Sequence, residues 1–462
     1  MIAPLLAALA LVTAAPPNVD WTRFGYTASR TSSGPAATGI TSANVGKLRR
    51  QVVQLDGTVD ASPIYLHAAQ IGGSAHDVFF VTTTYGKTEA IDASSGTVLW
   101  RFTPAGYSSW AGSYRITNAT PVADPSRRFV YSTSPDGRIH KLAVDDGREV
   151  WSTAITLLPE REKIAAPLNF WKGRVIATTG GYVGDAPPYQ GHVAILDAAS
   201  GKLLRVWNSL CSDRTGLIDP KSCAASDSAI WSRTGATIDP ATGDLLVATG
   251  NAPWDGRVNW GDSALKLSPN GTLLQNWTPV NEAELNTTDA DLGSTSPALL
   301  GSGYLAQGGK DGKIRLLRLA RMNGTAHAGP RKGGELQTVS TPSGGALLTA
   351  IAVWRSHGRT WIFAADFGGT AAWVLRGGRL HQVWRNGTAG TSPVVAGGLL
   401  YVYDPGGSLR VYAPGSGRQL ASLVAGAGHW NSPIVVAGRI ALPEGNANDH
   451  RTSGLLDIWR LP

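Results

Sequence analysis

Tyr85–Trp100 reads YGKTEAIDASSGTVLW, and this stretch decides the fold. Its first half contains a short strand, Glu89–Asp92, and Thr97–Phe102 supplies a return strand rich in β-branched and aromatic residues. Between the two strands, we expect Asp92 to accept hydrogen bonds from the backbone that follows it, and Gly96 to adopt a positive φ. The stretch therefore predicts a β-hairpin that ends in a tryptophan.

The same hairpin pattern recurs along the chain. The copies are Asp136–Trp151, Gly191–Trp207, Gly261–Trp277, the looser Gly368–Trp384, Gly406–Leu423 with Leu in place of Trp, and Lys310–Leu319, where only the first strand is clear. A small residue, usually before proline, and a second apolar hairpin precede each copy. These starts are Ser62-Pro63, Thr120-Pro121, Ala166-Pro167, Thr234-Gly235, Ser296-Pro297, Thr349-Ala350, Ser392-Pro393 and Ser432-Pro433. Eight sheet units of roughly 40–65 residues predict an all-β, eight-bladed propeller of four-stranded antiparallel blades.

The two ends of the chain are expected to share the last blade. Leu48–Leu55 is a strand before the first full unit, and Gly454–Leu461 is a strand with no partner after it. Pairing them completes the eighth sheet and removes two exposed edges. The 56 glycines and 27 prolines agree with a turn-rich all-β chain. We therefore expect one propeller domain over residues 16–462.

The N-terminus and the cysteines predict export. Met1–Ala15 is apolar and ends in small residues, as a secretory signal does, although no Lys or Arg precedes the apolar run. The alternative is a frayed N-terminal segment. Cys211 and Cys223 flank a polar loop without histidine, which favours one short disulfide over a zinc site, with free thiols as the alternative. We expect a secreted or periplasmic protein.

The positive charge of the chain does not indicate a nucleic-acid or membrane partner. The formal net charge is +8, and its densest runs are Arg49-Arg50, Arg127-Arg128 and Arg315–Arg321. These runs are dispersed and no nucleic-acid motif accompanies them, so they predict a solvated surface. The apolar N-terminal run is too short to span a bilayer. We expect a monomer without a membrane span.

Three features together resemble the eight-bladed propeller of the pyrroloquinoline quinone (PQQ) family. They are the repeat AIDASSGTVLW, the opening DWTRFGYTASRT with ITSANVGKL, and the insert TGNAPWDG with WGDS. The resemblance covers essentially the whole mature chain. That family includes quinoprotein alcohol dehydrogenases and non-catalytic relatives such as the propeller lipoprotein of outer-membrane assembly. The repeat therefore predicts the fold and leaves the activity open.

The resemblance implies roles for four residues. Trp231 matches the platform on which the flat quinone stacks, Asn251 of the TGN motif matches a calcium ligand, Asp291 matches the catalytic base, and Lys310 matches a cation near the quinone carbonyls. Stacking on indole, hard oxygen ligands and a carboxylate base suit that chemistry. Each residue also has a structural alternative: blade packing, a turn, a backbone hydrogen-bond acceptor and a surface cation, respectively.

Two departures from the family weaken the expectation of calcium binding and redox activity. The family supplies a glutamate as a second calcium ligand, and Tyr182 stands at the matching position, with Asp185 as a distant substitute. The dehydrogenases also carry two adjacent cysteines, and this chain has no such pair. No haem-binding Cys-x-x-Cys-His is present either, so electrons from any oxidation would leave to a separate carrier.

Polar residues are expected to gather at the central funnel. Residues just before the blade starts lie at the mouth of the channel in propellers, and here they include Asp60, Asn118, Trp231, Arg233, Thr391 and His429. A second polar cluster follows the last blade start. It contains Glu444, Asp449 and His450, and it predicts either a metal or polar-ligand site or a hydrated turn.

Two functions remain open from the sequence. The first is an exported scaffold that binds a small ligand or a partner protein in its funnel, with a weak quinone and calcium pocket. The second is a PQQ- and calcium-dependent dehydrogenase of alcohols or sugars. A hydrolase or lyase on the same funnel has no Ser-His-Asp or paired-carboxylate spacing to support it.

Overall fold

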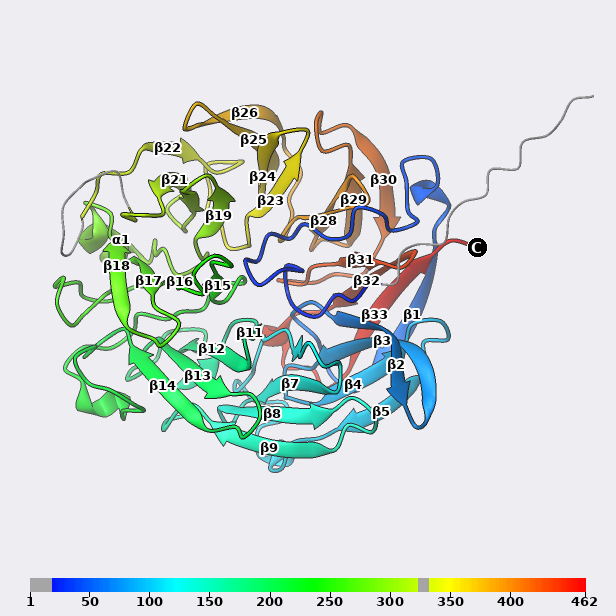
Figure 1. Cartoon of the computed structure of the whole chain (residues 1–462), viewed down its shortest axis with the longest axis horizontal. Helices are drawn as coiled ribbons and strands as arrows, with labels where there is room; N and C mark the ends of the chain where they lie inside the picture. Colours follow the sequence, from blue (N-terminus) through cyan, green and yellow to red (C-terminus); the bar gives the residue numbers. More distant parts are fainter. Residues whose placement is uncertain (1–18, 323–331) are drawn as a thin grey trace, which may run out of the picture.

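Eight antiparallel sheets follow one another around a ring in the computed structural model, which describes residues 19–322 and 332–462 (Figure 1). The expected signal segment, Met1–Ala15, lies outside the described residues. Successive sheets are successive units of the repeat, and the colours of Figure 1 run around the ring in sequence order. The predicted eight-bladed propeller is confirmed.

The first four blades contain β2 to β18. Their strands are β2 (Ile64–Ile71), β3 (Ser74–Thr82), β4 (Thr88–Asp92) and β5 (Val98–Phe102); β6 (Val122–Ala123), β7 (Phe129–Ser134), β8 (Arg138–Ala143) and β9 (Glu149–Ala154); β10 (Glu162–Ile164), β11 (Asn169–Trp171), β12 (Arg174–Gly181), β13 (His192–Asp197) and β14 (Leu203–Asn208); and β15 (Thr237–Ile238), β16 (Leu245–Ala248), β17 (Ala264–Leu267) and β18 (Leu273–Trp277).

The last four blades contain β19 to β33 together with β1. Their strands are β19 (Ala298–Gly301), β20 (Tyr304–Gln307), β21 (Lys313–Arg318) and β22 (Gln337–Ser340); β23 (Ala352–Ser356), β24 (Arg359–Asp366), β25 (Gly369–Arg376) and β26 (Arg379–Asn386); β27 (Val394–Ala396), β28 (Leu399–Asp404), β29 (Ser408–Tyr412) and β30 (Gln419–Val424); and β31 (Ile434–Val436), β32 (Arg439–Glu444), β33 (Gly454–Arg460) and β1 (Arg49–Leu55). Short helices are α1 (Glu282–Thr288), η1 (Val45–Lys47), η2 (Tyr107–Ser109), η3 (Pro220–Ser222) and η4 (Ala447–Asp449).

The turn of the repeated hairpin forms as the sequence predicts. Between β4 and β5, Asp92 Oδ1 accepts hydrogen bonds from the backbone N–H groups of Ser94 and Ser95, at 2.9 and 2.7 Å. Gly96 has φ 78°, a conformation that residues with a Cβ rarely adopt.

The tryptophan of the repeat contacts the next blade. Trp100 Nε1 donates to the Val144 carbonyl of the following blade at 2.8 Å, and a Cβ added to Gly147 would lie 2.5 Å from the Trp100 ring. Trp384 donates to Pro414 O in the same way, at 2.7 Å, and its ring covers Gly417. The repeat therefore couples the tryptophan of one blade to the glycine of its neighbour's turn.

The ring closes through the two ends of the chain. Strand β33 lies between β32 and β1, and its antiparallel register with β1 runs from Arg49↔Arg460 to Leu55↔Gly454. Trp459 of β33 is buried in the core shared with blades one and seven. The predicted pairing of the terminal strands is confirmed.

The segment before β1 crosses the centre of the ring, where Figure 1 shows it in dark blue. The buried Arg30 guanidinium donates to the Leu168 carbonyl of blade three at 2.7 Å. Backbone hydrogen bonds join the segment to other blades; they are Trp21 with Tyr65, Ala123 N to Thr22 O, Ile238 N to Ala28 O, Val353 N to Thr31 O, Val395 N to Ser32 O, and Gly438 N to Thr38 O. The segment thus gives inner strand edges their partners and occupies the channel.

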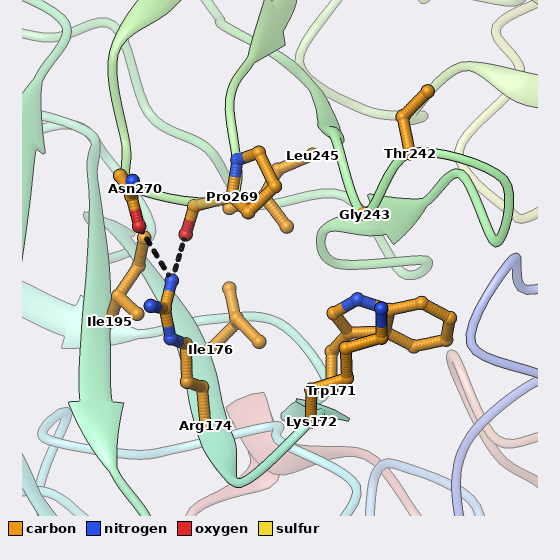
Figure 2. A pocket seen from close by; sticks show the side chains of 10 residues that line it. All are labelled: Trp171, Lys172, Arg174, Ile176, Ile195, Thr242, Gly243, Leu245, Pro269 and Asn270. Carbon is orange, nitrogen blue, oxygen red and sulfur yellow. Dashed lines mark hydrogen bonds between the residues drawn. The ribbon is translucent and has the colours of Figure 1, made fainter.

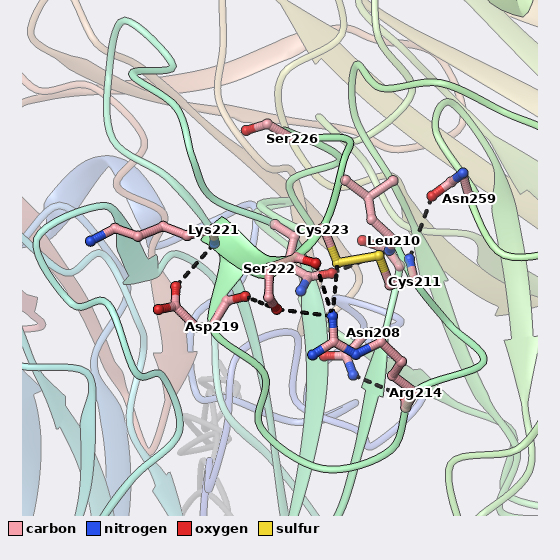
Figure 3. The surroundings of a disulfide bond; sticks show 12 residues. Asn208, Leu210, Cys211, Arg214, Asp219, Lys221, Ser222, Cys223, Ser226 and Asn259 are labelled. Atoms are coloured by element: carbon pink, nitrogen blue, oxygen red, sulfur yellow. Dashed lines mark hydrogen bonds between the residues drawn. A yellow bond between two sulfur atoms is a disulfide. The ribbon is translucent and has the colours of Figure 1, made fainter.

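The predicted disulfide joins Cys211 to Cys223 (Figure 3). It closes a loop that includes η3, and Arg214 Nη1 donates to Ser222 O across that loop at 3.1 Å. The loop belongs to the long connection between β14 and β15, which also carries Trp231. Within residues 19–322 and 332–462, no helix is long and apolar enough to cross a bilayer.

Deletion of residues 453–462 is expected to destabilise the whole propeller, because β1 and β32 then lose the strand between them. The Trp459→Ala substitution should lower the free energy of unfolding by about 3–5 kcal/mol through the cavity it leaves. Thermal and denaturant unfolding measure both effects. Deletion of residues 461–462, which lie beyond β33, is the control; a 453–462 deletion that melts with the intact protein would contradict closure by β33.

Replacing both cysteines by serine should lower the free energy of unfolding by about 3 kcal/mol, because the open loop gains entropy in the unfolded chain. Urea unfolding of oxidised protein, reduced protein and the double variant measures this. Equal midpoints for the three samples would show that the bond adds no stability.

Candidate functional site

A cavity of about 280 Å³ lies where the loops before the inner strands meet the loops between second and third strands. Asn118 and His429 precede the inner strands β6 and β31, whereas Asn251 and Lys310 follow β16 and β20. The propeller brings both kinds of loop to the same end of the ring. Residues that are far apart in the sequence therefore line one cavity.

Trp231 forms one wall of this cavity. Its side chain is partly exposed, and Nε1 donates to Asp291 Oδ2 at 3.0 Å. The Lys310 ammonium lies 5.3 Å from the centroid of the indole ring. Trp231 is thus a wall of the cavity, and its polar edge is fixed by a buried carboxylate.

Two carboxylates hold Lys310 beside this wall. Lys310 Nζ lies 2.8 Å from Asp291 Oδ1 and 2.5 Å from Asp289 Oδ1, and Asn251 Nδ2 donates to Asp289 Oδ1 at 2.8 Å. Burial raises the pKa of Asp291, although the Lys310 charge opposes this effect. Burial also acts to lower the pKa of Lys310, but attraction to Asp291 and Asp289 outweighs it and raises that pKa. The four residues implied by the family resemblance therefore meet in one network.

Gly250 of the TGN motif allows this network to pack. A Cβ at this position would lie 2.6 Å from Asp291 Oδ2, well inside van der Waals contact. The glycine is therefore needed for the close approach of the backbone to the buried carboxylate.

Asp60 organises a second part of the cavity wall. Its buried carboxylate accepts from His429 Nδ1 and Trp430 N, both at 2.8 Å, from Asn118 Nδ2 at 3.1 Å and from Ala447 N at 3.2 Å. Burial acts to raise the pKa of Asp60, but the hydrogen bond and charge of His429 outweigh it and lower the pKa. Asp60 thereby ties loops of blades one, two and eight together.

Two cations line the cavity near Asp60. The buried Arg233 guanidinium lies 5.1 Å above the Trp430 ring, and burial lowers its pKa to about 10. Lys163 Nζ reaches Asn118 Oδ1 at 3.5 Å, and burial, with the charge of Arg233, lowers its pKa to about 8. Two cations therefore lie on this side of the cavity, near the Asp60 carboxylate.

Comparison with known proteins agrees with the propeller fold. A family profile described as "Outer membrane protein assembly factor BamB" matches residues 41–217. Over 96% of its length the chain superposes on 80% of the quinohemoprotein alcohol dehydrogenase from Comamonas testosteroni, with a TM-score of 0.71 and 17% identity. The chain is an eight-bladed propeller, and part of it is similar to proteins of the PQQ-like family. BamB from Moraxella catarrhalis shares the fold, with a TM-score of 0.53 and 12% identity over 89% of this chain and 97% of that one.

Curated relatives of the chain include dehydrogenases. The dehydrogenase subunit of a quinone alcohol dehydrogenase from Gluconacetobacter polyoxogenes is 27% identical over 251 residues, which are 52% of this chain and 31% of that protein. A polyvinylalcohol dehydrogenase from Sphingopyxis sp. (strain 113P3) is 22% identical over 227 residues, 46% of this chain and 33% of that protein. The chain spans about a third of the length of these relatives.

The position that matches the PQQ family's second calcium ligand is filled differently in this chain. The Tyr182 hydroxyl donates to Pro159 O at 2.8 Å, and Asp185 accepts from the Tyr189 hydroxyl at 2.8 Å. Asn251 Oδ1 is buried and has no hydrogen-bond partner. Among the described residues, no three His, Cys, Asp or Glu side chains form a group that could hold a metal ion.

The remaining predicted funnel residues lie elsewhere. Thr391 is buried and donates to Asn431 O at 2.6 Å. Glu444 is paired with Arg50 at 2.5 Å, and with Asp449 it lines a separate groove of about 580 Å³. His450 follows η4, beside that groove, and does not line the cavity. Glu444, Asp449 and His450 of the C-terminal polar cluster thus lie outside the main cavity, which Asn448 of the same stretch lines.

Sequence reasoning missed Lys163 and Asp289. Lys163 lies on β10, an extra strand that pairs with the far end of β12 and precedes the start of the repeat at Ala166-Pro167. No motif marked it. Asp289 stands two residues before Asp291, and this closeness to a predicted site residue was the signal that could have identified it.

The Lys310→Met substitution is expected to destabilise the protein by about 2–3 kcal/mol at pH 8, because it leaves buried Asp291 without its cation. The loss should be smaller at pH 5. Without the ammonium, the pKa of Asp291 rises further above its unfolded value, so the folded state retains a proton at low pH and loses stability as pH rises. Urea unfolding at both pH values measures this. Lys310→Arg and the exposed Lys313→Met are controls, and a loss independent of pH would contradict the assignment to Asp291.

Proposed function

We propose that the chain is an extracytoplasmic ligand-binding propeller whose cavity takes a planar, anionic quinone of the PQQ type against Trp231, without a requirement for calcium. The observation that carries this proposal is the cavity itself. Trp231, partly exposed, lines the cavity beside Lys310, and two further cations, Arg233 and Lys163, line the same space. A planar anion can stack on indole while the cations neutralise its charge.

The residues present fit the quinone better than they fit calcium. Calcium takes six to eight oxygen ligands. Here the carboxylates of Asp289 and Asp291 already face the Lys310 ammonium. The Tyr182 hydroxyl donates a hydrogen bond to a backbone carbonyl. Asn251 Oδ1 is the unpartnered oxygen at this wall. This donor set supports a site in which Lys310 supplies the positive charge.

The chain's own groups would orient such a ligand. Trp231 is held edge-on by Asp291, so its ring is fixed before a ligand arrives. Lys310 is held by two carboxylates and can direct a further N–H to a quinone carbonyl. When bound in dehydrogenases, PQQ accepts a hydride from the alcohol. Because both Asp291 oxygens receive protein cations or donors here, Asp291 would serve first to position Trp231 and Lys310.

The extracytoplasmic location is supported by the disulfide between Cys211 and Cys223. Disulfides persist in oxidising compartments and are rare in the cytosol. The Cys211–Cys223 disulfide lies on the same connection between β14 and β15 as Trp231, which lines the cavity.

A PQQ-dependent dehydrogenase is the second candidate. Convergence of Trp231, Asn251, Asp291 and Lys310 in one cavity favours it, as does the similarity to quinone alcohol dehydrogenases. In that case Asp291 would accept the alcohol proton, which requires its carboxylate to exchange a protein partner for the substrate.

The test is titration of the full chain with PQQ in chelator and in calcium, followed by tryptophan fluorescence and visible absorbance. We expect saturable binding that calcium does not strengthen and that Trp231→Ala weakens about tenfold. The matched control is Trp171→Ala. Trp171 is a partly buried tryptophan in a groove of about 210 Å³ between blades three and four, where Arg174 donates to Pro269 O at 2.6 Å (Figure 2).

Dye-linked oxidation of alcohols and aldoses separates the two candidates. The binding proposal predicts no turnover with PQQ, with or without calcium. Robust turnover that is lost in Asp291→Asn and Asn251→Ala would establish the dehydrogenase. Absence of PQQ binding would remove the quinone proposal.

A further inference from the structure

We propose that Arg233 and Lys163 form an oxyanion subsite in the cavity, which binds a carboxylate or phosphate group of the ligand. This inference rests on the proposed ligand-binding role of the cavity and names the chemical group that its wall at Arg233 and Lys163 recognises.

The Arg233 guanidinium is the first observation. Its side chain is 6% exposed and lines the cavity, yet Nε and Nη1 are buried without a hydrogen-bond partner. Within the described residues, no hydrogen bond or ion pair to this guanidinium is present. A guanidinium stays charged and carries five N–H donors, so an oxyanion is its natural partner.

The nearby carboxylate does not meet this need. Asp60 attracts Arg233 electrostatically, but its oxygens accept from His429, Trp430, Asn118 and Ala447. Asp60 is thereby committed to holding the loops. Arg233 Cζ lies 5.1 Å from the centroid of the Trp430 ring, and this cation–π contact supplies no hydrogen-bond acceptor to the guanidinium.

Lys163 supplies the second cation. Its ammonium has one long hydrogen bond, 3.5 Å to Asn118 Oδ1, and it lines the same cavity. The groups that face it are Arg233, Asp60, Asp185 and the Tyr182 ring. Repulsion between Lys163 and Arg233 adds to burial in lowering the pKa of Lys163 to about 8. An anion between the two cations would relieve both effects.

This wall is separate from the Lys310 wall. Lys310 forms ion pairs with Asp289 and Asp291. By contrast, Asp60 attracts Arg233, and Asp60 and Asp185 attract Lys163, without forming an ion pair. A ligand stacked on Trp231 would therefore find its strongest unmet positive charge at Arg233 and Lys163.

The test uses the full chain, isothermal titration calorimetry, and three probes: succinate, inorganic phosphate and the neutral dimethyl succinate. We expect the two anions to bind and the diester not to bind. Arg233→Met and Lys163→Met should each weaken anion binding at least tenfold, whereas Arg233→Lys should weaken it less. The exposed Arg148→Met is the matched control. Unchanged succinate affinity in either Met variant, or equal binding of the diester, would overturn the subsite; a Met variant that does not fold leaves the other as the test.

The pH dependence is a second readout. Succinate stays fully ionised between pH 7 and pH 9, while Lys163 loses its proton across this range. Affinity of the wild-type protein should fall about tenfold, and that of Lys163→Met should not change. A flat wild-type profile would contradict the role of Lys163.

A parallel PQQ titration distinguishes failure of the subsite from failure of the proposed function. PQQ binding that is unchanged in Arg233→Met, with no succinate binding, overturns the subsite and leaves the quinone proposal intact. Succinate binding that requires Arg233, with no PQQ binding, supports the subsite and removes the quinone.

Discussion

The contact between a tryptophan of one blade and the glycine turn of the next sets the geometry of the ring. Trp100 against Gly147 and Trp384 against Gly417 are two instances of it. Each indole covers a backbone that has no Cβ and donates to a carbonyl of the same turn, so two blades meet at one spacing. Because the blades are held at that spacing, the loops at their inner ends converge, and the cavity results from this convergence.

The two walls of the cavity distribute charge differently. At Trp231, the charged groups have partners: Lys310 lies between two carboxylates, and Asp291 receives the indole N–H. At Arg233, Nε and Nη1 of the buried guanidinium have no hydrogen-bond partner. Buried charge without a partner is expensive in a folded protein and concentrates where a ligand binds. A fold built only for stability would have placed an acceptor there.

The sequence made the fold predictable because each blade repeats the same hairpin, whereas the site was predictable only in part. Trp231 and Asp291 could be placed because a motif marks them. Lys163 could not, since β10 lies outside the repeat and reaches the cavity through its pairing with β12. The sequence could not show that Arg233 lacks hydrogen-bond partners, because this depends on which acceptors the folded chain places near its guanidinium. The route of residues 19–48 across the channel depends on backbone hydrogen bonds, which leave no pattern of side chains.

Strand β1 forms its ladder with a strand about four hundred residues later in the chain, from Arg49↔Arg460 onward. During synthesis or export, β1 emerges before the other strands and stays unpaired until β33, the last strand, has emerged. Joining segments so distant costs chain entropy that local hairpins do not face, which makes this step slow. Until it happens, β1 and the open side of blade eight are free edges able to pair with other chains. The propeller is therefore most vulnerable to aggregation when it is almost complete.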